Sequence, residues 1–272
     1  MKFNILSLLA LTSLFSSCNS PSEKMDKGTI SKEIIDLSHT FSDETVYWVT
    51  AKEFKLDVVA KGDTDKGFFY AANNFETAEH GGTHIDAPIH FAKGKQSVED
   101  IPLDKLIGEA IKIDVTANAS GNADYLITIK DFTNWEKTHG KIPTGAIVLL
   151  ETGHSKYYPD KVKYLGTDQR GAEAIKLLHF PGLSPEAASW LVKNRSINAI
   201  GIDTPSIDYG QSEYFKSHVI LLAENIPAFE NITNLEQLPA KGFEVIALPM
   251  KIKDGSGAPL RIIATLKASE VN

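Results

Sequence analysis

The sequence predicts an α/β fold, built as a single domain around a mixed β-sheet, and three observations lead to this prediction. Segments with the pattern of strands alternate with segments with the pattern of helices along most of the chain. The last two strand-like segments are joined by a Gly-rich turn, which indicates an antiparallel hairpin and therefore a mixed sheet. The chain has 272 residues, 42% of them hydrophobic and 23% charged, as is typical of a globular protein with a large core.

The first predicted strands precede residue 80. Residues 33–39 have the pattern of a short strand followed by a polar turn. Residues 54–60 alternate apolar and polar side chains with period two, which predicts a half-buried strand. Residues 62–67 are predicted as a loop, and residues 68–77 as a second strand that leads directly into a histidine-rich stretch.

Two helices carry clear start signals. Residues 128–139 are predicted as a helix in which Thr128 is the N-cap and Asp131 occupies the capping-box position. Ser184 is the predicted N-cap of a second helix, with Pro185 in its first turn. Both signals place helices between strands, as an α/β fold requires.

The remaining elements are inferred from apolar runs. Residues 146–150 are apolar throughout and include β-branched side chains, as expected for a strand covered on both faces. Further strands are predicted at residues 111–115, 197–202, 228–230, 243–250 and 260–266, and a third helix at about residues 213–223. Residues 151–169 are predicted as a long polar loop.

The first eighteen residues predict a signal peptide of the lipoprotein type. Lys2 precedes an apolar stretch that is too short to span a bilayer, and small residues come just before Cys18. Residues 15–18, FSSC, resemble a bacterial lipobox, whereas a lone buried cysteine in a cytosolic enzyme would leave the flanking pattern unexplained. Residues 19–31 are polar and are predicted as a flexible tether, so the folded domain would span residues 32–272. We expect an exported protein, lipid-anchored through Cys18 in the bacterial periplasm or at the outer membrane.

The charge balance argues against a nucleic-acid partner. The formal net charge is −7, and no cluster of Lys and Arg is visible, although phosphate binding depends on such clusters. We therefore expect a small-molecule substrate, and contact with a membrane only through the lipid anchor.

The histidine-rich stretch at residues 80–91, HGGTHIDAPIHF, has the composition of a metal site. Its four ionisable side chains, separated by four, two and four residues, are His80, His84, Asp86 and His90. In extended backbone the even offsets put the side chains of His80, His84 and Asp86 on one face, while two glycines and a proline disfavour a helix. Two imidazoles and a carboxylate suit Zn²⁺ or Mn²⁺, and three protein ligands leave one coordination position open.

An open coordination position indicates catalysis. A metal ion there would lower the pKa of water and polarise a carbonyl oxygen. His90 could then accept the water proton and return it to a leaving nitrogen. The alternative, histidines that lie together by chance, is disfavoured by four such side chains within eleven residues.

A second candidate pair lies downstream. His218 and Glu230 are twelve residues apart, and Glu230 stands among apolar neighbours, where a carboxylate needs a hydrogen-bond partner or a metal. From the residues alone, a metal-ligating pair and a structural salt bridge are equally open. The other histidines, predicted as surface or supporting residues, are His39, His139, His154 and His179.

Residues 80–91 resemble the HxGTHxDxPxHF signature of the cyclase-type metal-dependent hydrolases, a family that includes bacterial kynurenine formamidase and isatin hydrolase. The similarity continues at residues 36–39 (DLSH), 181–184 (PGLS), 199–208 (AIGIDTPSID), from His218 through Glu230 to Ile232, and at 257–261 (GAPLR). It therefore covers nearly all of the chain after about residue 33.

The resemblance implies a fold of the swivelling β/β/α type, assembled as a homodimer or homotetramer. It implies that His80, His84 and Asp86 bind a first Zn²⁺ or Mn²⁺ ion and that His90 is the catalytic acid and base. In the two-metal members the equivalent of Asp86 also contacts a second ion, held here by His218 and Glu230, so one or two ions per subunit are expected.

The expected function is hydrolysis of a non-peptide amide C–N bond, in an aryl formamide such as N-formylkynurenine or in a cyclic amide. A lactone hydrolase or a cyclase using the same site, and a non-catalytic metal- or solute-binding lipoprotein, are the alternatives. Aromatic side chains before the site, at Trp48, Phe68 and Phe69, are interpreted as pocket lining or as ordinary core residues. Glu151 stands where the family often has an arginine, which puts anion binding at that position in question.

Overall fold

The computed structural model describes residues 33–266, and the following description is limited to them. The predicted signal peptide, the lipobox cysteine and the tether lie outside the described residues. Among the described residues, no helix combines the length and the apolar character needed to cross a membrane.

The domain is built on a mixed sheet that closes on itself. Around the ring the strands follow the order β12 (Gly257–Leu266), β11 (Lys241–Pro249), β5 (Ile107–Asp114), β7 (Ile147–Glu151), β9 (Ala199–Ile202), β10 (Ala228–Glu230) and β4 (His84–Asp86). β4 pairs with β10 on one side and with β12 on the other, which closes the barrel, and β1 (Glu33–Asp36) pairs with β12 outside the ring. Strands β5, β7, β9 and β10 run parallel, and the other pairings are antiparallel. The predicted α/β fold with a mixed sheet is confirmed, although the sequence did not predict the closure.

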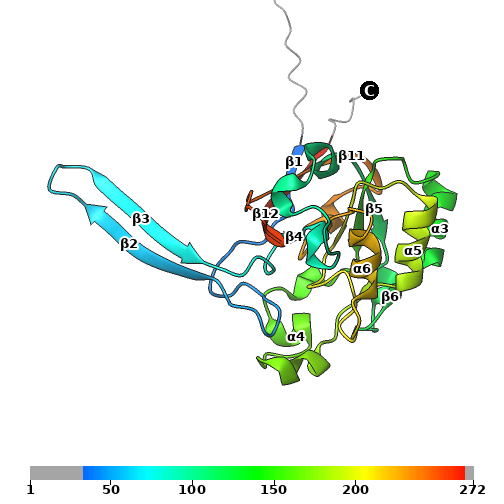
Figure 1. The fold of residues 1–272 in the computed structure, drawn as a ribbon, viewed down its shortest axis with the longest axis horizontal. Helices are drawn as coiled ribbons and strands as arrows, with labels where there is room; N and C mark the ends of the chain where they lie inside the picture. The colour runs from blue at the N-terminus through cyan, green and yellow to red at the C-terminus, as the bar shows by residue number, and fades with distance from the viewer. Residues whose placement is uncertain (1–32, 267–272) are drawn as a thin grey trace, which may run out of the picture. The chain divides into compact units, whose positions relative to one another are not determined.

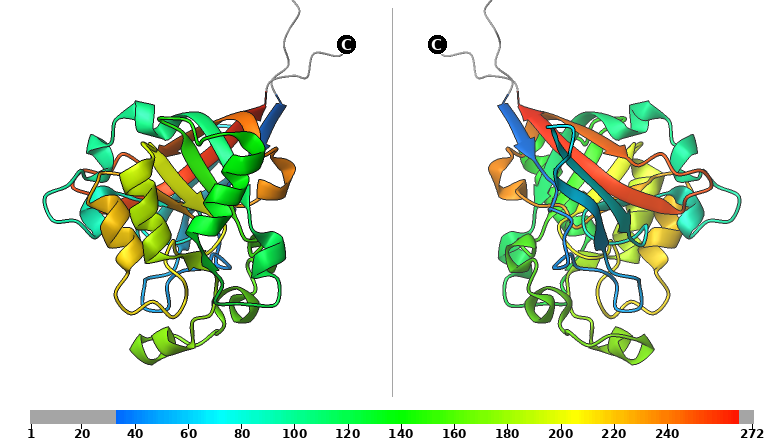
Figure 2. Two further views of the ribbon diagram at one scale, coloured as in Figure 1. Left: turned by 90° about the vertical axis from the view of Figure 1, so that its right-hand side faces the viewer. Right: turned by 90° about the vertical axis from the view of Figure 1, so that its left-hand side faces the viewer.

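Strand β7 lies in the middle of the sheet and is buried on both faces, as its apolar run predicts. Ile147 and Leu149 pack in one hydrophobic cluster with side chains of β10, β11 and β12. Val148 and Leu150 point the other way, into a second cluster with side chains of the helices. Helices α3 (Ile129–His139), α5 (Pro185–Asn194) and α6 (Lys216–Leu222) cover this second face (Figures 1 and 2).

The predicted helix starts are present. The backbone N–H of Thr128 donates to Asp131 Oδ2 at 2.8 Å, as in a capping box, and Ser184 Oγ accepts from Ala187 N–H at 3.1 Å. Helix α6 begins later than predicted, because Phe215 just before it has left-handed backbone geometry with φ of 46°.

Shorter elements connect these parts. They are α1 (Leu103–Leu106), α2 (Thr116–Ala119), α4 (Lys161–Leu165), the small strands β6 (Leu126–Ile127) and β8 (Gly182–Leu183), and 3₁₀ turns that include η1 (Pro88–His90) and η3 (Ser155–Tyr157). The segment predicted as a long loop, residues 151–169, therefore contains η3 and α4.

Strands β2 (Lys55–Asp63) and β3 (Phe69–Glu76) form a separate antiparallel hairpin that projects from the rest of the domain (Figure 1). Both strands occur where the sequence predicts them. The prediction that the first is half-buried is wrong for the single chain, because no residue of β2 is buried and the hairpin pairs with no other described strand. Phe68 and Phe69, interpreted as pocket or core residues, are exposed on this hairpin.

Candidate metal centre and active site

The short strand β4 carries the centre of the site. His84 and Asp86 point to the same side of β4 and are buried, while Ile85 between them packs into the hydrophobic core. Antiparallel pairing with β10 sets Glu230 directly opposite His84. The strand register therefore brings two carboxylates and an imidazole to one spot.

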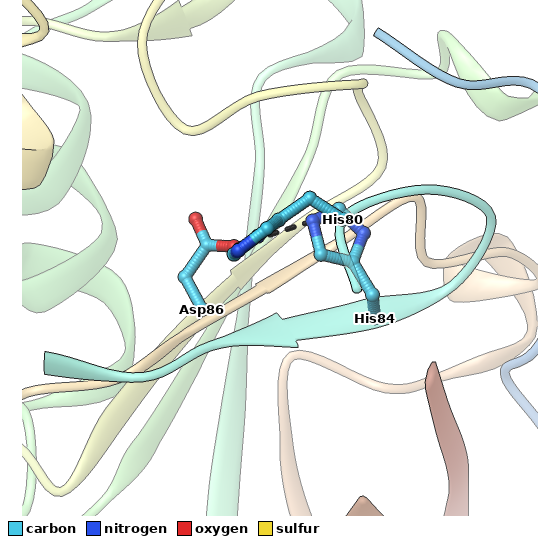
Figure 3. A group of neighbouring side chains, drawn as sticks. All are labelled: His80, His84 and Asp86. Carbon is cyan, nitrogen blue, oxygen red and sulfur yellow. Dashed lines mark hydrogen bonds and ion pairs between the residues drawn. The ribbon is translucent and has the colours of Figure 1, made fainter. Parts of the chain in front are cut away.

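His80 reaches the same spot from the loop before β4, not from the strand. The prediction from even spacing holds for His84 and Asp86, but Gly82, with φ of 54°, turns the chain between His80 and the strand. His80 Nδ1 still lies 2.7 Å from Asp86 Oδ1, and Figure 3 shows the three side chains pointing toward one another.

His218 enters from helix α6. Its Nε2 lies 2.8 Å from Asp86 Oδ2 and 3.0 Å from Glu230 Oε1. Asp86 thus belongs to two groups of potential ligands, His80–His84–Asp86 and Asp86–His218–Glu230, each with its ligand atoms within 4.8 Å of one another. The structure brings together all five side chains that the sequence and the resemblance suggested as metal ligands.

Each of the three histidines has one ring nitrogen bound to an acceptor outside the cluster. His84 Nδ1 donates to the carbonyl of Gly82 at 2.9 Å, and His218 Nδ1 donates to Asp208 Oδ2 at 2.7 Å. Because these bonds use the Nδ1 proton of each ring, Nε2 of both rings is the atom that faces Asp86 and Glu230.

For His80, the acceptor outside the cluster is the hydroxyl of Ser256. Ser256 Oγ lies 2.5 Å from Glu79 Oε2, so its hydroxyl donates its single proton to that carboxylate and accepts from His80 Nε2 at 2.9 Å. The other nitrogen, His80 Nδ1, then faces Asp86. His80 Nδ1, His84 Nε2 and His218 Nε2 therefore all point at carboxylate oxygens. This arrangement requires a cation or protons between the nitrogens and the oxygens.

The pKa shifts within the cluster also indicate that a cation or protons must lie between the histidines and the carboxylates. Burial alone would lower the pKa of His84, but the carboxylates of Asp86 and Glu230 outweigh burial and raise it to about 10. Burial alone would likewise raise the pKa of Asp86, yet the facing histidines hold it well below its usual range. His84 Nε2 is buried without a hydrogen-bond partner, 3.2 Å from Asp86 Oδ1 and 3.3 Å from Glu230 Oε2. The donor set of imidazole nitrogens and carboxylate oxygens fits a divalent cation such as Zn²⁺ or Mn²⁺.

His90 lies beside the cluster rather than within it. It closes the 3₁₀ turn η1, and its ring stacks on that of His80 with 3.9 Å between centroids. Burial lowers the pKa of His90 to about 4, so its imidazole is neutral at neutral pH and can accept a proton.

A cavity of about 260 Å³ opens onto these side chains. Its lining includes the aromatic side chains of Trp48, Phe91 and Phe215, and also Asp86 and His90. No Lys or Arg is among the described residues that line it. Of the three aromatic residues that the sequence suggested for a pocket, only Trp48 lies here.

Comparison with known proteins gives the family. The sequence matches the Cyclase family over residues 35–209. The chain is 32% identical over 218 residues to isatin hydrolase of Roseibium aggregatum, a match that covers 77% of this chain and 80% of the relative. The chain belongs to the Cyclase family.

Further members of the Cyclase family agree with this assignment. Kynurenine formamidase of Salinibacter ruber is 28% identical over 230 residues, covering 85% of this chain and 96% of the relative. The structure of isatin hydrolase A from Labrenzia aggregata, bound to benzyl benzoate, superposes with a TM-score of 0.79 at 33% identity, covering 87% of this chain and 94% of that one. The family resemblance and the fold predicted from the sequence are confirmed, and the predicted class, a hydrolase of non-peptide amide bonds, agrees with these relatives.

Within this Cyclase-family site, the sequence did not single out Asp208 and Ser256, which accept hydrogen bonds from His218 and His80. Asp208 follows strand β9 in an otherwise buried loop, and Ser256 lies in the turn before β12, so neither stands next to a histidine in the sequence. The one available signal for Asp208 was a carboxylate within a largely apolar segment, which requires a partner.

The remaining candidates have structural contacts. Glu151 pairs with Lys112 at 2.6 Å and does not line the cavity. His39 stacks on Tyr158, His154 bonds to the carbonyl of Tyr164, and His179 pairs with Asp124 at the surface. His139 lies at the end of α3 against Trp135.

Proposed function

We propose that this chain hydrolyses the amide bond of a neutral cyclic amide fused to an aromatic ring, the chemical class of isatin. One observation carries the proposal: a cavity with aromatic lining and no Lys or Arg among its described lining residues opens directly onto the cluster of histidines and carboxylates. A flat bicyclic ring suits walls formed by Trp48, Phe91 and Phe215.

The lining also favours this substrate over N-formylkynurenine. That aryl formamide carries an amino-acid carboxylate at neutral pH, and burying a carboxylate requires a cationic partner. Away from the candidate metal ligands, the described lining offers no Lys or Arg as such a partner. The greater identity to isatin hydrolase than to kynurenine formamidase supports the same choice.

We infer that the two ligand groups hold one or two divalent cations. His80, His84 and Asp86 would hold the first, and Asp86, His218 and Glu230 the second, with Zn²⁺ and Mn²⁺ both compatible with nitrogen and oxygen donors. When bound, such a cation supplies Lewis acidity, which polarises a carbonyl and makes water a better nucleophile at neutral pH.

His90 is proposed as the residue that moves the proton. As a neutral imidazole in the cavity wall, it can accept a proton from the attacking water and then deliver it to the amide nitrogen as the C–N bond breaks. Its stacking on His80 fixes the plane of the ring, so that the proton is transferred from a constant position. The aromatic walls exclude bulk water around the substrate.

The experiment is a comparison of His84→Ala and His90→Ala with wild type, using isatin and N-formylkynurenine as substrates and measuring bound metal. We expect wild type to hydrolyse isatin with the higher kcat/KM. His84→Ala should lose both metal and activity, whereas His90→Ala should keep its metal and lose at least a hundredfold in kcat. His179→Ala, at the exposed pair with Asp124, is the matched control and should resemble wild type.

The result distinguishes the alternatives. Faster turnover of N-formylkynurenine would shift the assignment to an aryl formamidase, and turnover of lactones alone would shift it to a lactone hydrolase. Metal binding without hydrolysis of any amide or lactone would support a binding lipoprotein instead. Full activity and unchanged metal content in His84→Ala would refute the metal-dependent proposal altogether.

We further propose that the protein is exported and lipid-anchored. This proposal is supported by the sequence of residues 1–18, with Cys18 in the lipobox position. Metabolic labelling with a fatty acid, compared between wild type and Cys18→Ala, tests it.

A further inference from the structure

Asn231 directly follows the candidate ligand Glu230 and connects two parts of the site. It is buried, and its backbone has left-handed geometry with φ of 53°. Asparagine is one of the few residues besides glycine that adopt this geometry readily. Its side-chain Nδ2 donates to the carbonyl oxygen of Gly82 at 2.8 Å. Asn231 therefore joins the end of β10 to the segment that precedes His84.

The carbonyl oxygen of Gly82 accepts two hydrogen bonds. One comes from Nδ2 of Asn231 at 2.8 Å and the other from Nδ1 of His84 at 2.9 Å. A carbonyl oxygen has two lone pairs, so both are used. The position of this oxygen sets the direction of the His84 ring, whose Nε2 lies 3.2 Å from Asp86 Oδ1. Any group that holds the Gly82 carbonyl in place therefore also orients His84.

The orientation of the Asn231 amide follows from its partners. The Gly82 oxygen can only accept, so the nitrogen of the amide must face it. The other amide atom, Oδ1, then lies 2.9 Å from the hydroxyl of Tyr164, which has to donate. That hydroxyl has a single proton, and its second neighbour, the carbonyl oxygen of Asp203, is more distant at 3.2 Å. Tyr164 is therefore the donor that holds the amide.

Tyr164 itself is held firmly. It lies on α4, within the segment predicted as a loop, and its side chain is fully buried. Burial raises the pKa of the hydroxyl well above its usual range, so the proton needed for donation is retained. The ring belongs to a hydrophobic cluster with Val46 and Phe180, and the Tyr164 carbonyl accepts from Nε2 of His154 at 2.7 Å. These contacts fix the position of the hydroxyl against Asn231.

We propose that Tyr164 is a positioning residue for His84. Its hydroxyl fixes the amide of Asn231, the amide fixes the carbonyl of Gly82, and this carbonyl orients the imidazole of His84. Tyr164 does not line the cavity, so it affects a bound cation only through His84. The inference rests on the metal site proposed above, and it gives α4 a role in that site.

The alternative is that Tyr164 only fills the core. Removing its hydroxyl, however, would leave Oδ1 of Asn231 as a buried acceptor without a donor among the described residues. The amide could find a new partner only by turning, which would break its bond to Gly82. Buried polar networks are sensitive to the loss of one member in this way. The effect of the hydroxyl therefore extends to His84.

The test removes the hydroxyl alone, in Tyr164→Phe, and uses Co²⁺ as the probe because its visible absorption spectrum depends on the geometry of its ligands. We expect the Co²⁺ affinity of Tyr164→Phe to fall about tenfold and the spectrum of the bound ion to shift. The matched control is Tyr125→Phe, which removes a hydroxyl that donates to Asp131 at 3.0 Å at the start of α3. It should resemble wild type in both measurements.

Equal Co²⁺ affinity and an unchanged spectrum in Tyr164→Phe would overturn the inference and leave the proposed metal site intact. A wild type that binds no Co²⁺ would overturn the metal site itself, and the role of Tyr164 is then decided by a measurement on the metal-free protein.

That measurement is the exchange of the His84 Nδ1 proton with water, followed by NMR of metal-free protein with isotope-labelled histidine. The resonance is assigned by its loss in His84→Ala. Exchange should be about tenfold faster in Tyr164→Phe than in wild type, because the bond to the Gly82 carbonyl opens more often. Tyr125→Phe should exchange like wild type. The same exchange rate in Tyr164→Phe and wild type would refute a positioning role.

Discussion

At the residue scale, the site depends on the hydrogen-bond acceptors that orient the histidine rings as much as on the histidines themselves. Asp208 is the clearest case, because one carboxylate accepts from the backbone N–H and from Nδ1 of His218, and also from the backbone N–H of Ser217. These bonds orient Nε2 of His218 toward Asp86 and Glu230. A residue that fixes both the tautomer and the orientation of a ligand contributes to metal affinity without touching the metal.

Replacing Asp208 with Asn should therefore weaken metal binding. We expect the affinity of the weaker of two Zn²⁺ or Mn²⁺ sites to fall about 10- to 100-fold, because His218 loses its anionic partner. Competition with a chelator at fixed pH measures this change. Asp124→Asn is the control, since Asp124 also accepts from a histidine Nδ1, at 2.8 Å from His179 but at the surface. Equal affinities in wild type and Asp208→Asn would contradict the assigned role.

His39 provides a residue-scale prediction about stability. Burial lowers its pKa to about 4 from an ordinary value of 6.5, and its ring stacks on Tyr158 at 3.6 Å. The folded state therefore prefers the neutral imidazole, so the stabilising contribution is complete above pH 6.5 and is lost as the pH falls toward 4. The loss should amount to about 2 to 3 kcal/mol.

His39→Phe keeps an aromatic ring against Tyr158 and removes the titrating group. Urea unfolding at pH 7 and pH 4.5 should show a smaller acid-induced loss of unfolding free energy for His39→Phe than for wild type. The comparison cancels the contributions of other titrating groups, which both proteins share. An identical pH dependence in the two proteins would mean that His39 is not the responsible residue.

At the element scale, β4 can hold its ligand side chains close to those of other elements because it is short and pairs with a strand on each side. Its three residues lie between β10 and β12, and the neighbouring strands approach closely where they meet it. Gly257 on β12 makes this approach possible, since a Cβ there would lie 2.5 Å from His80 Cε1 and from the carbonyl oxygen of Ile85. Neither contact is sterically allowed, so glycine is required at this point.

Gly257→Ala should therefore displace His80 or open the pairing of β12 with β4. We expect reduced metal affinity together with a loss of about 1 to 3 kcal/mol in unfolding free energy. Gly108→Ala is the matched control, because Gly108 is also in a strand but has no atom within 4 Å of an added Cβ. Wild-type metal binding and stability in Gly257→Ala would show that β12 can shift without consequence.

At the scale of the whole molecule, the candidate metal ligands come from separate parts of the closed sheet and its covering helices. They lie on the loop before β4, on β4 itself, on α6 and on β10, so a bound ion would connect these elements. Without an ion, buried carboxylates face histidines whose charge state must change to balance them. Metal binding should therefore be coupled to the stability of the fold.

Adding Zn²⁺ or Mn²⁺ at about a hundredfold excess over its dissociation constant should stabilise the metal-free protein by about 2.7 kcal/mol. For a domain of this size that corresponds to a rise in Tm of roughly 5 to 10 °C, measurable by thermal denaturation after chelation and metal addition. His84→Ala should show little of this rise, whereas His179→Ala should show all of it. A Tm that is unaffected by either metal in wild type would argue against the site.

The sequence by itself determined most of the local structure and part of the site. Period-two and apolar runs predicted most of the strands, although β4, β6 and β8 were not assigned and β5 begins at Ile107 rather than at residue 111. Caps such as Thr128 and Ser184 predicted where two helices begin. These signals are readable because they depend on neighbours within a few residues. The close spacing of His84 and Asp86 predicted one shared face for the same reason.

Tertiary structure decided the rest. Closure of the sheet through β4, the meeting of Glu230 with His84, and the acceptors Asp208 and Ser256 all depend on strand register and on packing between segments far apart in the chain. The backbone turn at Gly82 set the direction from which the His80 side chain reaches Asp86. The β2–β3 hairpin shows the same distinction: the period-two pattern of its first strand predicted burial, whereas only the three-dimensional arrangement showed that no described part of the same chain covers it.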